Sequence, residues 1–355
     1  MKLYFDNIIF SLQKAGGISL VWSELLKNIN NLNKENTCFE YKNAKDNLFY
    51  KEINLSNFKI RFLHFFNKIL SQFIKISINE KEPFIFHSSY FRLCNNPKAV
   101  NITTVHDFIY EQSKMSLKQK FRIYLDYKVI RKSDAIVCVS ENTKNDLIKY
   151  IPTIDKNKIY VIYNGVSEDY YKIEEKIISK YKNFILFVGS RNGYKNFDFA
   201  INAIANTNFN LLIVGKPLIE NELKVLNRLL PNRYECISFP SNGFLNVLYN
   251  SVYCLLYPSS YEGFGLPILE AQKAGCPVIA LNKSSIPEII GNKDLLISEL
   301  DDFQVKNNLY KLQDPKFRNY IIQEGIVNSR RFSWEKMAEQ YYQLYNNLLS
   351  INQYL

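Results

Sequence analysis

The sequence lacks the patterns that mark several large protein classes. Its six cysteines are scattered without a CxxC pair, and most lie in apolar runs. This spacing gives no metal site and predicts buried free thiols in a reducing compartment. No apolar run reaches the length of about 18 residues that a membrane-spanning helix needs. Met1 is not followed by a basic and apolar leader, so we expect a cytoplasmic protein.

Other absences exclude further functions. The paired glycines Gly16 and Gly17 do not form a GxGxxG fingerprint, so a nicotinamide cofactor is not supported. The sequence contains no solenoid repeat, no low-complexity tract and no readable nucleic-acid recognition module. We therefore expect no metal, no cofactor and no nucleic-acid partner.

The composition is that of a globular protein of two domains. The chain has 355 residues, of which 47% are hydrophobic and 22% charged, so it can bury a sizeable core. The formal net charge is +11, and such an excess suggests an acidic partner. Nucleic acid, an anionic membrane surface and a phosphate-bearing substrate would all meet this condition.

Short apolar runs alternate with helical patterns along most of the chain. This alternation predicts an α/β fold with doubly wound parallel sheets. We expect a first domain over residues 1–166, a polar linker over 167–182 and a second domain over 183–330. A closing helical segment over 331–355 should begin near Ser333 and pack back toward the first domain.

The most informative stretch runs from Tyr257 to Ala271. It has the pattern of a buried strand, a glycine loop and a helix, with Glu262 in the loop and Glu270 in the helix. A helix N-terminus attracts phosphate, whereas ionised carboxylates accept hydrogen bonds from hydroxyls. The two features together fit a sugar nucleotide. The alternative is an ordinary strand-to-helix turn with solvated acids.

Three more loops contain candidate site residues. Arg191 and Lys195 follow a predicted strand and precede a helix at about 197–205, where they could clamp a phosphate. His87 and His106 both stand at the ends of predicted strands, and His106-Asp107 is a candidate catalytic or sugar-contacting pair. Gly16 and Gly17 could let a phosphate or a sugar approach the backbone. Each loop could also be merely structural.

Two basic stretches lie in the first half of the chain. Residues 55–81 and 114–132 combine Phe and Leu with many Lys and Arg residues, which predicts basic amphipathic helices. Such helices favour an anionic membrane surface or a lipid-phosphate substrate over nucleic acid. The alternative is that these helices pack on the core and expose a basic face to solvent.

Taken together, these segments resemble a known family. The string from Glu262 to Glu270 is similar to the E-x7-E motif of retaining glycosyltransferases of family 4, which have the GT-B fold. The similarity extends to the Gly16-Gly17 loop, to His106, to the segment 189–196 and to the segment 332–335. It therefore covers nearly the whole chain.

The resemblance implies two Rossmann-like domains that face each other across a central cleft. The first would hold the acceptor and the second a nucleotide-sugar donor. It also implies catalytic roles for four residues: His106 near the reacting carbon, Glu262 on the donor sugar, and Arg191 and Lys195 on the diphosphate. Glu270 would bind the ribose. The other donor-binding positions would be Gly16, Gly17, Ser190, Gly263, Phe264, Gly265 and Leu266.

The expected activity is that of a retaining, metal-independent hexosyltransferase. The segment from Arg191 to Asn196 resembles one found in mannosyltransferases, which favours GDP-mannose over a UDP-hexose. The acceptor would be a glycan or a lipid-linked glycan of a surface polysaccharide, reached from the inner face of the membrane. A GT-B epimerase or phosphorylase and a non-catalytic basic lipid-binding protein are the alternatives. Front-face attack and double displacement both remain open.

Overall fold

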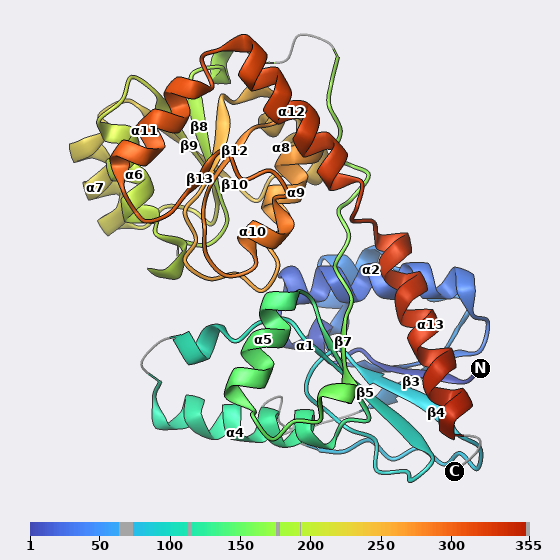
Figure 1. Ribbon diagram of the computed structural model, residues 1–355. Coiled ribbons are helices and arrows are strands. Elements are labelled where there is room, and N and C mark those ends of the chain that lie inside the picture. Colours follow the sequence, from blue (N-terminus) through green and yellow to red (C-terminus); the bar gives the residue numbers. More distant parts are fainter. Residues whose placement is uncertain (64–73, 113–114, 175–177, 192, 353–355) are drawn as a thin grey trace. The chain divides into compact units, whose positions relative to one another are not determined.

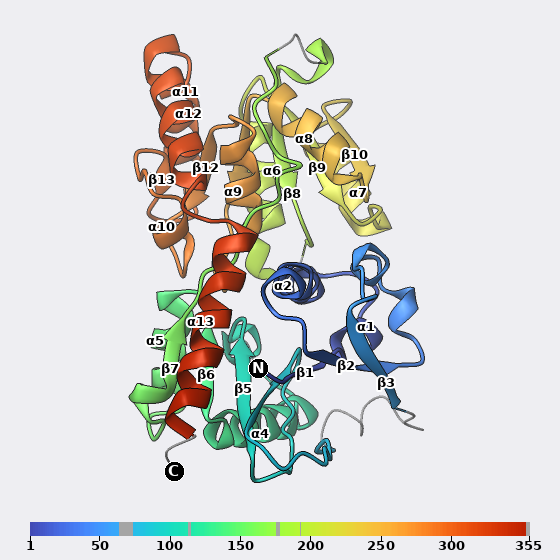
Figure 2. The same cartoon turned by 90° about the vertical axis from the view of Figure 1, so that its right-hand side faces the viewer.

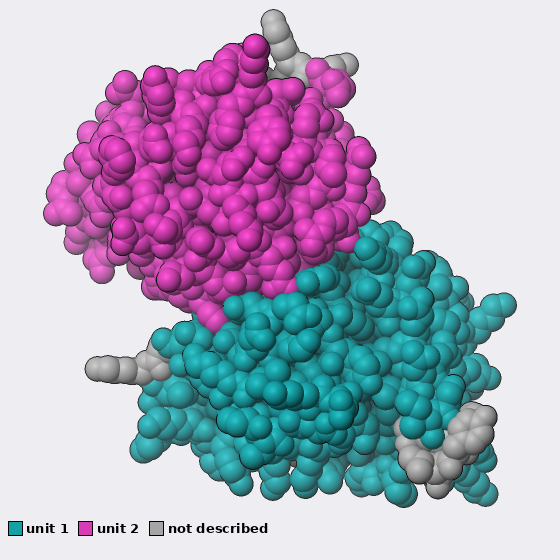
Figure 3. Space-filling view, viewed as in Figure 1, with its two compact units in different colours: residues 1–165, 333–355 teal, residues 166–332 magenta. Residues whose placement is uncertain are grey.

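The computed structural model describes residues 1–63, 74–112, 115–174, 178–191 and 193–352. The chain forms two compact units (Figure 3). Unit 1 contains Met1–Gly165 and Ser333–Leu355, and unit 2 contains Val166–Phe332. The described residues of the segment 167–182, which was predicted as a linker, fall within unit 2. Its aromatic side chains explain why, because Tyr170 and Tyr181 are buried against rings of unit 2.

Unit 1 is built on a sheet of seven parallel strands in the order β3-β2-β1-β4-β5-β6-β7 (Figure 1). The strands of its centre are continuous apolar runs because both faces of a parallel doubly wound sheet are covered. Their bounds are β1 Leu3–Asp6, β2 Asn36–Tyr41, β3 Phe58–Leu63, β4 Phe84–Ser88, β5 Ala99–Val105, β6 Ala135–Cys138 and β7 Ile159–Val161.

The helices of unit 1 begin at recognisable caps. Ser116 and Gln119 form a capping box at the start of α4, and the Ser140 hydroxyl accepts a hydrogen bond from the Thr143 N–H at the start of α5. The α-helices are α1 Ile9–Leu12, α2 Gly17–Leu32, α4 Leu117–Lys132, α5 Glu141–Tyr150 and α13 Trp334–Asn352. The short 3-10 helices are η1 Ala44–Asp46, η2 Phe49–Glu52, η3 Ile109–Gln112 and η4 Lys156–Lys158.

Helix α13 completes unit 1 from the far end of the chain. It packs against α2 (Figure 2). The Tyr345 hydroxyl lies 2.7 Å from His87 Nδ1, and the Tyr341 hydroxyl lies 2.9 Å from Thr104 Oγ1. The Ser333 hydroxyl accepts a hydrogen bond from the Lys336 N–H at 3.1 Å, as expected for a helix that begins there. The closing helix is thus joined to strands β4 and β5 of unit 1.

Unit 2 repeats the same topology with six parallel strands in the order β10-β9-β8-β11-β12-β13. They are β8 Phe184–Val188, β9 Asn210–Gly215, β10 Tyr234–Ser238, β11 Cys254–Tyr257, β12 Val278–Leu281 and β13 Leu296–Ile297. The helices are η5 Ser179–Tyr181, η6 Gly193–Lys195, α6 Phe197–Ala205, α7 Glu220–Leu229, α8 Asn242–Ser251, α9 Leu266–Lys273, α10 Ile286–Ile289, α11 Asp302–Lys311 and α12 Pro315–Ser329.

The two basic stretches adopt different structures. The helix expected within 55–81 is wrong for its described part, because residues 58–63 form the edge strand β3 and 74–81 are not helical. Residues 64–73 lie outside the described residues. The stretch 114–132 forms α4 from Leu117, as expected. Among the described helices, none is long and apolar enough to cross a membrane.

Counted within each unit, the strand order is 3-2-1-4-5-6-7 in unit 1 and 3-2-1-4-5-6 in unit 2, and this confirms the predicted doubly wound α/β class. The order reverses between β1 and β4 in unit 1 and between β8 and β11 in unit 2. In such sheets, ligands bind beyond the carboxyl ends of the strands at these switch points. The loops after β1, β4, β8 and β11 are therefore where a site is expected in each unit.

Candidate active site

In unit 2, the loops that follow β8 and β11 are joined to each other by hydrogen bonds. Asn196 precedes α6 with a left-handed φ of 52°, and its side-chain amide donates to the Pro258 carbonyl at 2.7 Å and to Ser260 Oγ at 2.6 Å. The Ser260 N–H donates to the Tyr194 carbonyl at 2.8 Å. The two predicted site segments therefore form one surface at the switch point.

Lys195 and Glu262 meet on this surface. Lys195 Nζ pairs with a Glu262 carboxylate oxygen and lies 3.1 Å from the Tyr257 hydroxyl. The side chains of Lys195 and Glu262 are 11% and 13% exposed, so both charges have lost most of their contact with water. Their mutual attraction compensates for this loss of hydration. The loop after β12 fixes the backbone of Glu262, whose N–H donates to Ser284 Oγ at 2.8 Å. The structure thus pairs two residues that the sequence assigned to separate parts of a ligand.

Arg191 is held by its own unit. Its Nε lies 2.6 Å from Glu222, and its two terminal nitrogens donate to the carbonyls of Lys216 and Pro217 at 3.0 and 2.8 Å. The Arg191 side chain is only 6% exposed. The guanidinium therefore organises the loop between β9 and α7. Its predicted role as a phosphate ligand stays a prediction.

The glycine loop before α9 has the backbone geometry that the motif suggested. Gly265 precedes the helix with a φ of 107°, which a side chain would strain, and Pro267 stands in the first turn. The Phe264 carbonyl accepts a hydrogen bond from the Ser285 hydroxyl at 2.9 Å. Residues 263–266 therefore lie at a helix N-terminus. Ser190 lies in the loop after β8, half-buried, next to Arg191.

Glu270, on α9, is surrounded by tyrosines. The Tyr249 hydroxyl donates to Glu270 Oε2 at 2.9 Å, and the Tyr170 phenol also faces the carboxyl. Burial raises the pKa of Glu270 to about 7, and the hydrogen bonds from the two tyrosines act against that rise. Sequence reasoning missed both tyrosines, because their approach depends on how α8 and the segment after Gly165 pack.

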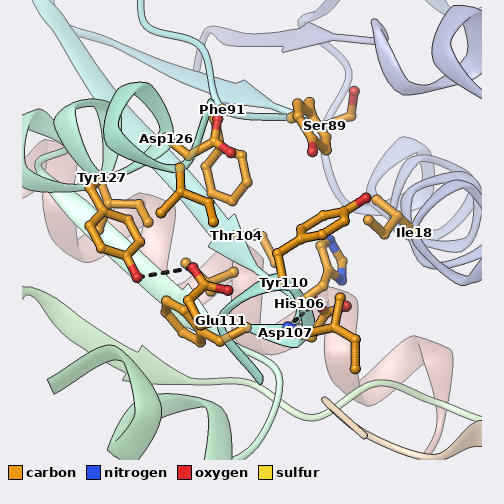
Figure 4. Close-up of a pocket in the computed structure, with 16 residues that line it drawn as sticks. Ile18, Ser89, Phe91, Thr104, His106, Asp107, Tyr110, Glu111, Asp126 and Tyr127 are labelled. Carbon is orange, nitrogen blue, oxygen red and sulfur yellow. Dashed lines mark hydrogen bonds between the residues drawn. The ribbon is translucent and has the colours of Figure 1, made fainter. Parts of the chain in front are cut away.

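In unit 1, the structure brings His106 and the start of α2 together. His106 follows β5, and it lines a pocket of about 160 Å³ together with Ile18 of the first turn of α2 (Figure 4). Gly16 caps this helix, and a side chain added at Gly17 would meet no atom within 4 Å. Burial lowers the pKa of His106 to about 4, so its imidazole is neutral at physiological pH.

The other lining residues of this pocket come mainly from η3, α4 and the loop after β4. They include three carboxyl groups and five aromatic rings, and of these groups only Asp107, next to His106, was singled out from the sequence. The stretch that forms α4 was recognised in the sequence only for its basic residues, which gave no indication that it also lines a pocket. The additional residues are Glu111, Asp126, Tyr90, Phe91, Phe108, Tyr110 and Tyr127.

His87 does not belong to the site, although it also ends a predicted strand. It is fully buried in β4 and contacts Tyr345 and Thr104 through its two ring nitrogens. Burial lowers its pKa to about 3, which keeps the ring neutral. All six cysteines are free thiols. Among the described residues, no group of three or more His, Cys, Asp or Glu side chains is arranged to hold a metal ion.

Comparison with known proteins gives matches along most of the chain. The family model for Glycosyltransferase Family 4 matches residues 38–170, and the model for Glycosyl transferases group 1 matches residues 171–328. O-antigen chain mannosyltransferase RfbU of Salmonella typhimurium is 30% identical over 250 residues, which cover 66% of this chain and 69% of the relative.

One further relative supports the same family, and one solved structure supports the fold. O-antigen chain mannosyltransferase B of Escherichia coli is 26% identical over 290 residues, 74% of each chain. The structure of HepE from Anabaena in complex with UDP and glucose has a TM-score of 0.73 at 15% identity, and the match covers 97% of this chain and 99% of that one. The chain is therefore a glycosyltransferase that belongs to family 4 and has the GT-B fold.

Proposed function

We propose that the protein is a retaining hexosyltransferase that transfers a hexose from a nucleotide-diphosphate sugar to a glycan without a metal ion. The observation that supports this most directly is the pairing of Lys195 with Glu262 on joined loops at the switch point of unit 2. One surface thereby offers a cation to a diphosphate and a carboxylate to sugar hydroxyls. A nucleotide sugar needs both.

The chemistry follows from the leaving group. The bond between the anomeric carbon and the diphosphate breaks, and the electron pair leaves on the phosphate oxygen. Lys195 stabilises that developing charge, with Arg191 joining it once released from Glu222. Glu262 accepts hydrogen bonds from the donor sugar, Glu270 accepts them from the ribose, and the neutral His106 contacts the sugar near the reacting carbon. The acceptor hydroxyl oxygen becomes bonded to the anomeric carbon, and its proton ends on the released nucleoside diphosphate.

The donor is GDP-mannose in this proposal, with a UDP-hexose as the second candidate. Two relatives bear the name O-antigen chain mannosyltransferase. The segment from Arg191 to Asn196 also resembles one found in mannosyltransferases, which favours GDP-mannose as the donor. The UDP-hexose alternative is supported by HepE, whose structure contains UDP and glucose.

Thermal unfolding with a panel of donors tests this assignment. GDP-mannose is expected to raise the melting temperature more than UDP-, dTDP- and ADP-hexoses do. A ligand at 100 times its dissociation constant stabilises the folded state by about 2.7 kcal/mol. Because no metal ion takes part in the proposed reaction, neither the rise in melting temperature caused by the donor nor the turnover number should change when EDTA is added. If no nucleotide sugar shifts the transition, the donor proposal is wrong, and a loss of turnover in EDTA would contradict the metal-independent mechanism.

Donor binding should depend on pH through Glu270. Its raised pKa of about 7 means that the ionised form, which accepts ribose hydrogen bonds, is lost as the pH falls below 7. Donor affinity is thus expected to fall about tenfold per pH unit below 7 and to level off above it. Calorimetric titration across this range measures it.

The Tyr249→Phe variant provides the matched control for this pH dependence. The substitution removes a hydrogen bond that favours the ionised carboxylate, so the midpoint should move to higher pH. A wild-type affinity that is flat from about pH 5 to 9 would exclude Glu270 as the titrating group.

The acceptor in this proposal is a lipid-linked intermediate of a surface glycan, and the enzyme works in the cytoplasm on the inner face of the membrane. Helix α4 supplies the membrane contact. Leu117, Phe121 and Tyr124 are 85%, 64% and 58% exposed, and they lie on the same side of the helix as Lys128. Exposed apolar and basic side chains on one helix face suit an interface with anionic lipid.

Sedimentation with lipid vesicles tests the membrane contact. Replacing Lys118, Lys120 and Lys128 by glutamine is expected to lower binding to phosphatidylglycerol vesicles at least tenfold, since each charge near the surface contributes about 1 kcal/mol. The control variant changes Lys306, Lys311 and Lys316 of unit 2, which removes the same charge elsewhere. An equal loss in both variants, or no binding by the parent protein, would refute a role for α4.

A further inference from the structure

The pocket beside His106 is rich in acids and aromatic rings. Asp107, Glu111 and Asp126 line it together with five aromatic side chains, and none of the lining residues that the structure describes is a lysine or an arginine. Figure 4 shows Asp126 and Tyr127 from α4, Glu111 from η3 and Tyr110 around the same space. In unit 2, by contrast, Glu262 is paired with the ammonium group of Lys195.

Asp126 is the least satisfied of these acids. Its side chain is 14% exposed, and its nearest cation, Arg122 Nε, is 3.9 Å away, beyond hydrogen-bond distance. Arg122 instead donates from another nitrogen to the Tyr90 hydroxyl, and its buried Nε has no hydrogen-bond partner. Among the described residues, none donates a hydrogen bond to Asp126. Buried carboxyl groups without such partners are uncommon and cluster at functional sites.

The electrostatics of the pocket disfavour an anionic ligand. Burial raises the pKa of Asp126 to about 7; Arg122 opposes that rise and Glu111 adds to it. Burial also raises the pKa of Glu111, which accepts a hydrogen bond from the Tyr127 hydroxyl at 2.9 Å. A phosphate or carboxylate bound here would meet three acids and, among the described lining residues, no lysine or arginine. Hydroxyl groups can donate to these acids, and the apolar faces of a sugar ring can pack on the aromatic rings.

We infer that this pocket binds the terminal sugar of the acceptor, that this sugar is uncharged, and that Asp126 determines the specificity by accepting hydrogen bonds from its hydroxyls. The inference rests on the proposed transfer reaction and adds the acceptor class to it. The position supports it, because the pocket lies at the carboxyl end of β5 and includes His106 and the first turn of α2.

An acceptor panel tests the inference. The probes are octyl hexosides of gluco, galacto and manno configuration, each beside the matched octyl uronide, which differs only by a carboxylate at C6. Transfer to the best hexoside should exceed transfer to its uronide at least 100-fold in kcat/KM. Asp126→Asn should raise the acceptor KM about 10- to 100-fold, as expected for a lost hydrogen bond to a charged group. Asp126→Asn should also lower the ratio of kcat/KM for the hexoside to kcat/KM for the uronide.

Two controls separate specificity from folding. Asp46→Asn makes the same charge change on an exposed residue of unit 1 and should alter neither the acceptor KM nor the preference. Glu111→Gln repeats the test on another wall of the pocket, in case Asp126→Asn unfolds the protein. The donor dissociation constant of each variant, measured by calorimetry, should stay within about twofold of the parent value.

Equal transfer to hexosides and uronides would overturn the inference. So would an unchanged preference in both Asp126→Asn and Glu111→Gln. These outcomes differ from a failure of the proposed function, in which the parent protein would bind no nucleotide sugar and transfer to no probe.

Discussion

Replacing Glu262 by glutamine is expected to lower the turnover number by about 100- to 1,000-fold. Glutamine keeps the shape of the side chain but removes the charge that pairs with Lys195. In the proposed function this charge also accepts hydrogen bonds from the donor sugar. Because the interaction strengthens as the sugar reacts, kcat should fall more than the donor affinity does. Steady-state kinetics with the donor identified by thermal unfolding measures both quantities.

The chain offers a closely matched control for this change. Glu168 pairs with Lys273 in the same unit, but the Glu168 side chain is 80% exposed. Glu168→Gln removes the same charge from a solvated ion pair, and its kinetics should match those of the parent. Near-parental turnover in Glu262→Gln, with the fold intact by circular dichroism, would reject the assignment of Glu262 to the donor sugar.

Replacing Lys195 by methionine should have a comparable effect on turnover and a larger one on donor binding. Methionine retains the aliphatic stem but provides no charge for the diphosphate, and it leaves Glu262 without its cation. We expect kcat/KM for the donor to fall by about 1,000-fold or more, since the charge acts on both the bound donor and the departing diphosphate.

The Lys273→Met variant is the control for the lysine. Its ion pair with Glu168 lies in the same unit, so general effects of losing a lysine should appear in both variants. In Lys195→Met, calorimetry with the free nucleoside diphosphate isolates the phosphate contact from the sugar contacts. Unchanged affinity for that diphosphate would show that the phosphates lie elsewhere, and Arg191 would then become the main candidate for the clamp.

Much of the fold follows from local sequence patterns. Strand β5, which ends just before His106, and helix α6 over Phe197–Ala205 lie where the sequence predicts them, because their signals are local. Strand β2 was not predictable in this way. Three of its residues, Asn36, Thr37 and Glu40, are buried and polar, and Asn36 and Glu40 are bonded to Asn33 and Asn7. A strand whose polar groups find partners elsewhere in the fold has no continuous apolar run.

The edge strand β3 was predicted as part of a helix because most of its residues are exposed, whereas β2 was missed because several of its buried residues are polar. Its residues from Lys59 to Phe62 are exposed, so the strand shows neither a buried run nor a clean alternation. Only the pairing with β2 on one side reveals it. The basic charge of the stretch could be read from the sequence, but its secondary structure could not.

The candidate site was predictable as a set of residues but not as a set of contacts. The motif and the strand-end loops identified Glu262, Lys195 and His106. The attachment of Arg191 to Glu222 and to two carbonyls depends on the loop between β9 and α7, which no spacing encodes. Asp126, another acid of the pocket beside His106, was also missed, because α4 brings it there from a stretch recognised only for its basic charge.

The return of α13 to unit 1 determines the order in which the protein can be completed on the ribosome. The seven strands of unit 1 emerge first, but Tyr341 and Tyr345, which contact Thr104 and His87, emerge only after all of residues 166–332. Unit 2 can therefore finish folding while β4 and β5 still lack their last helix. A nascent chain that stalls before Ser333 would expose that face of the sheet to chaperones and proteases.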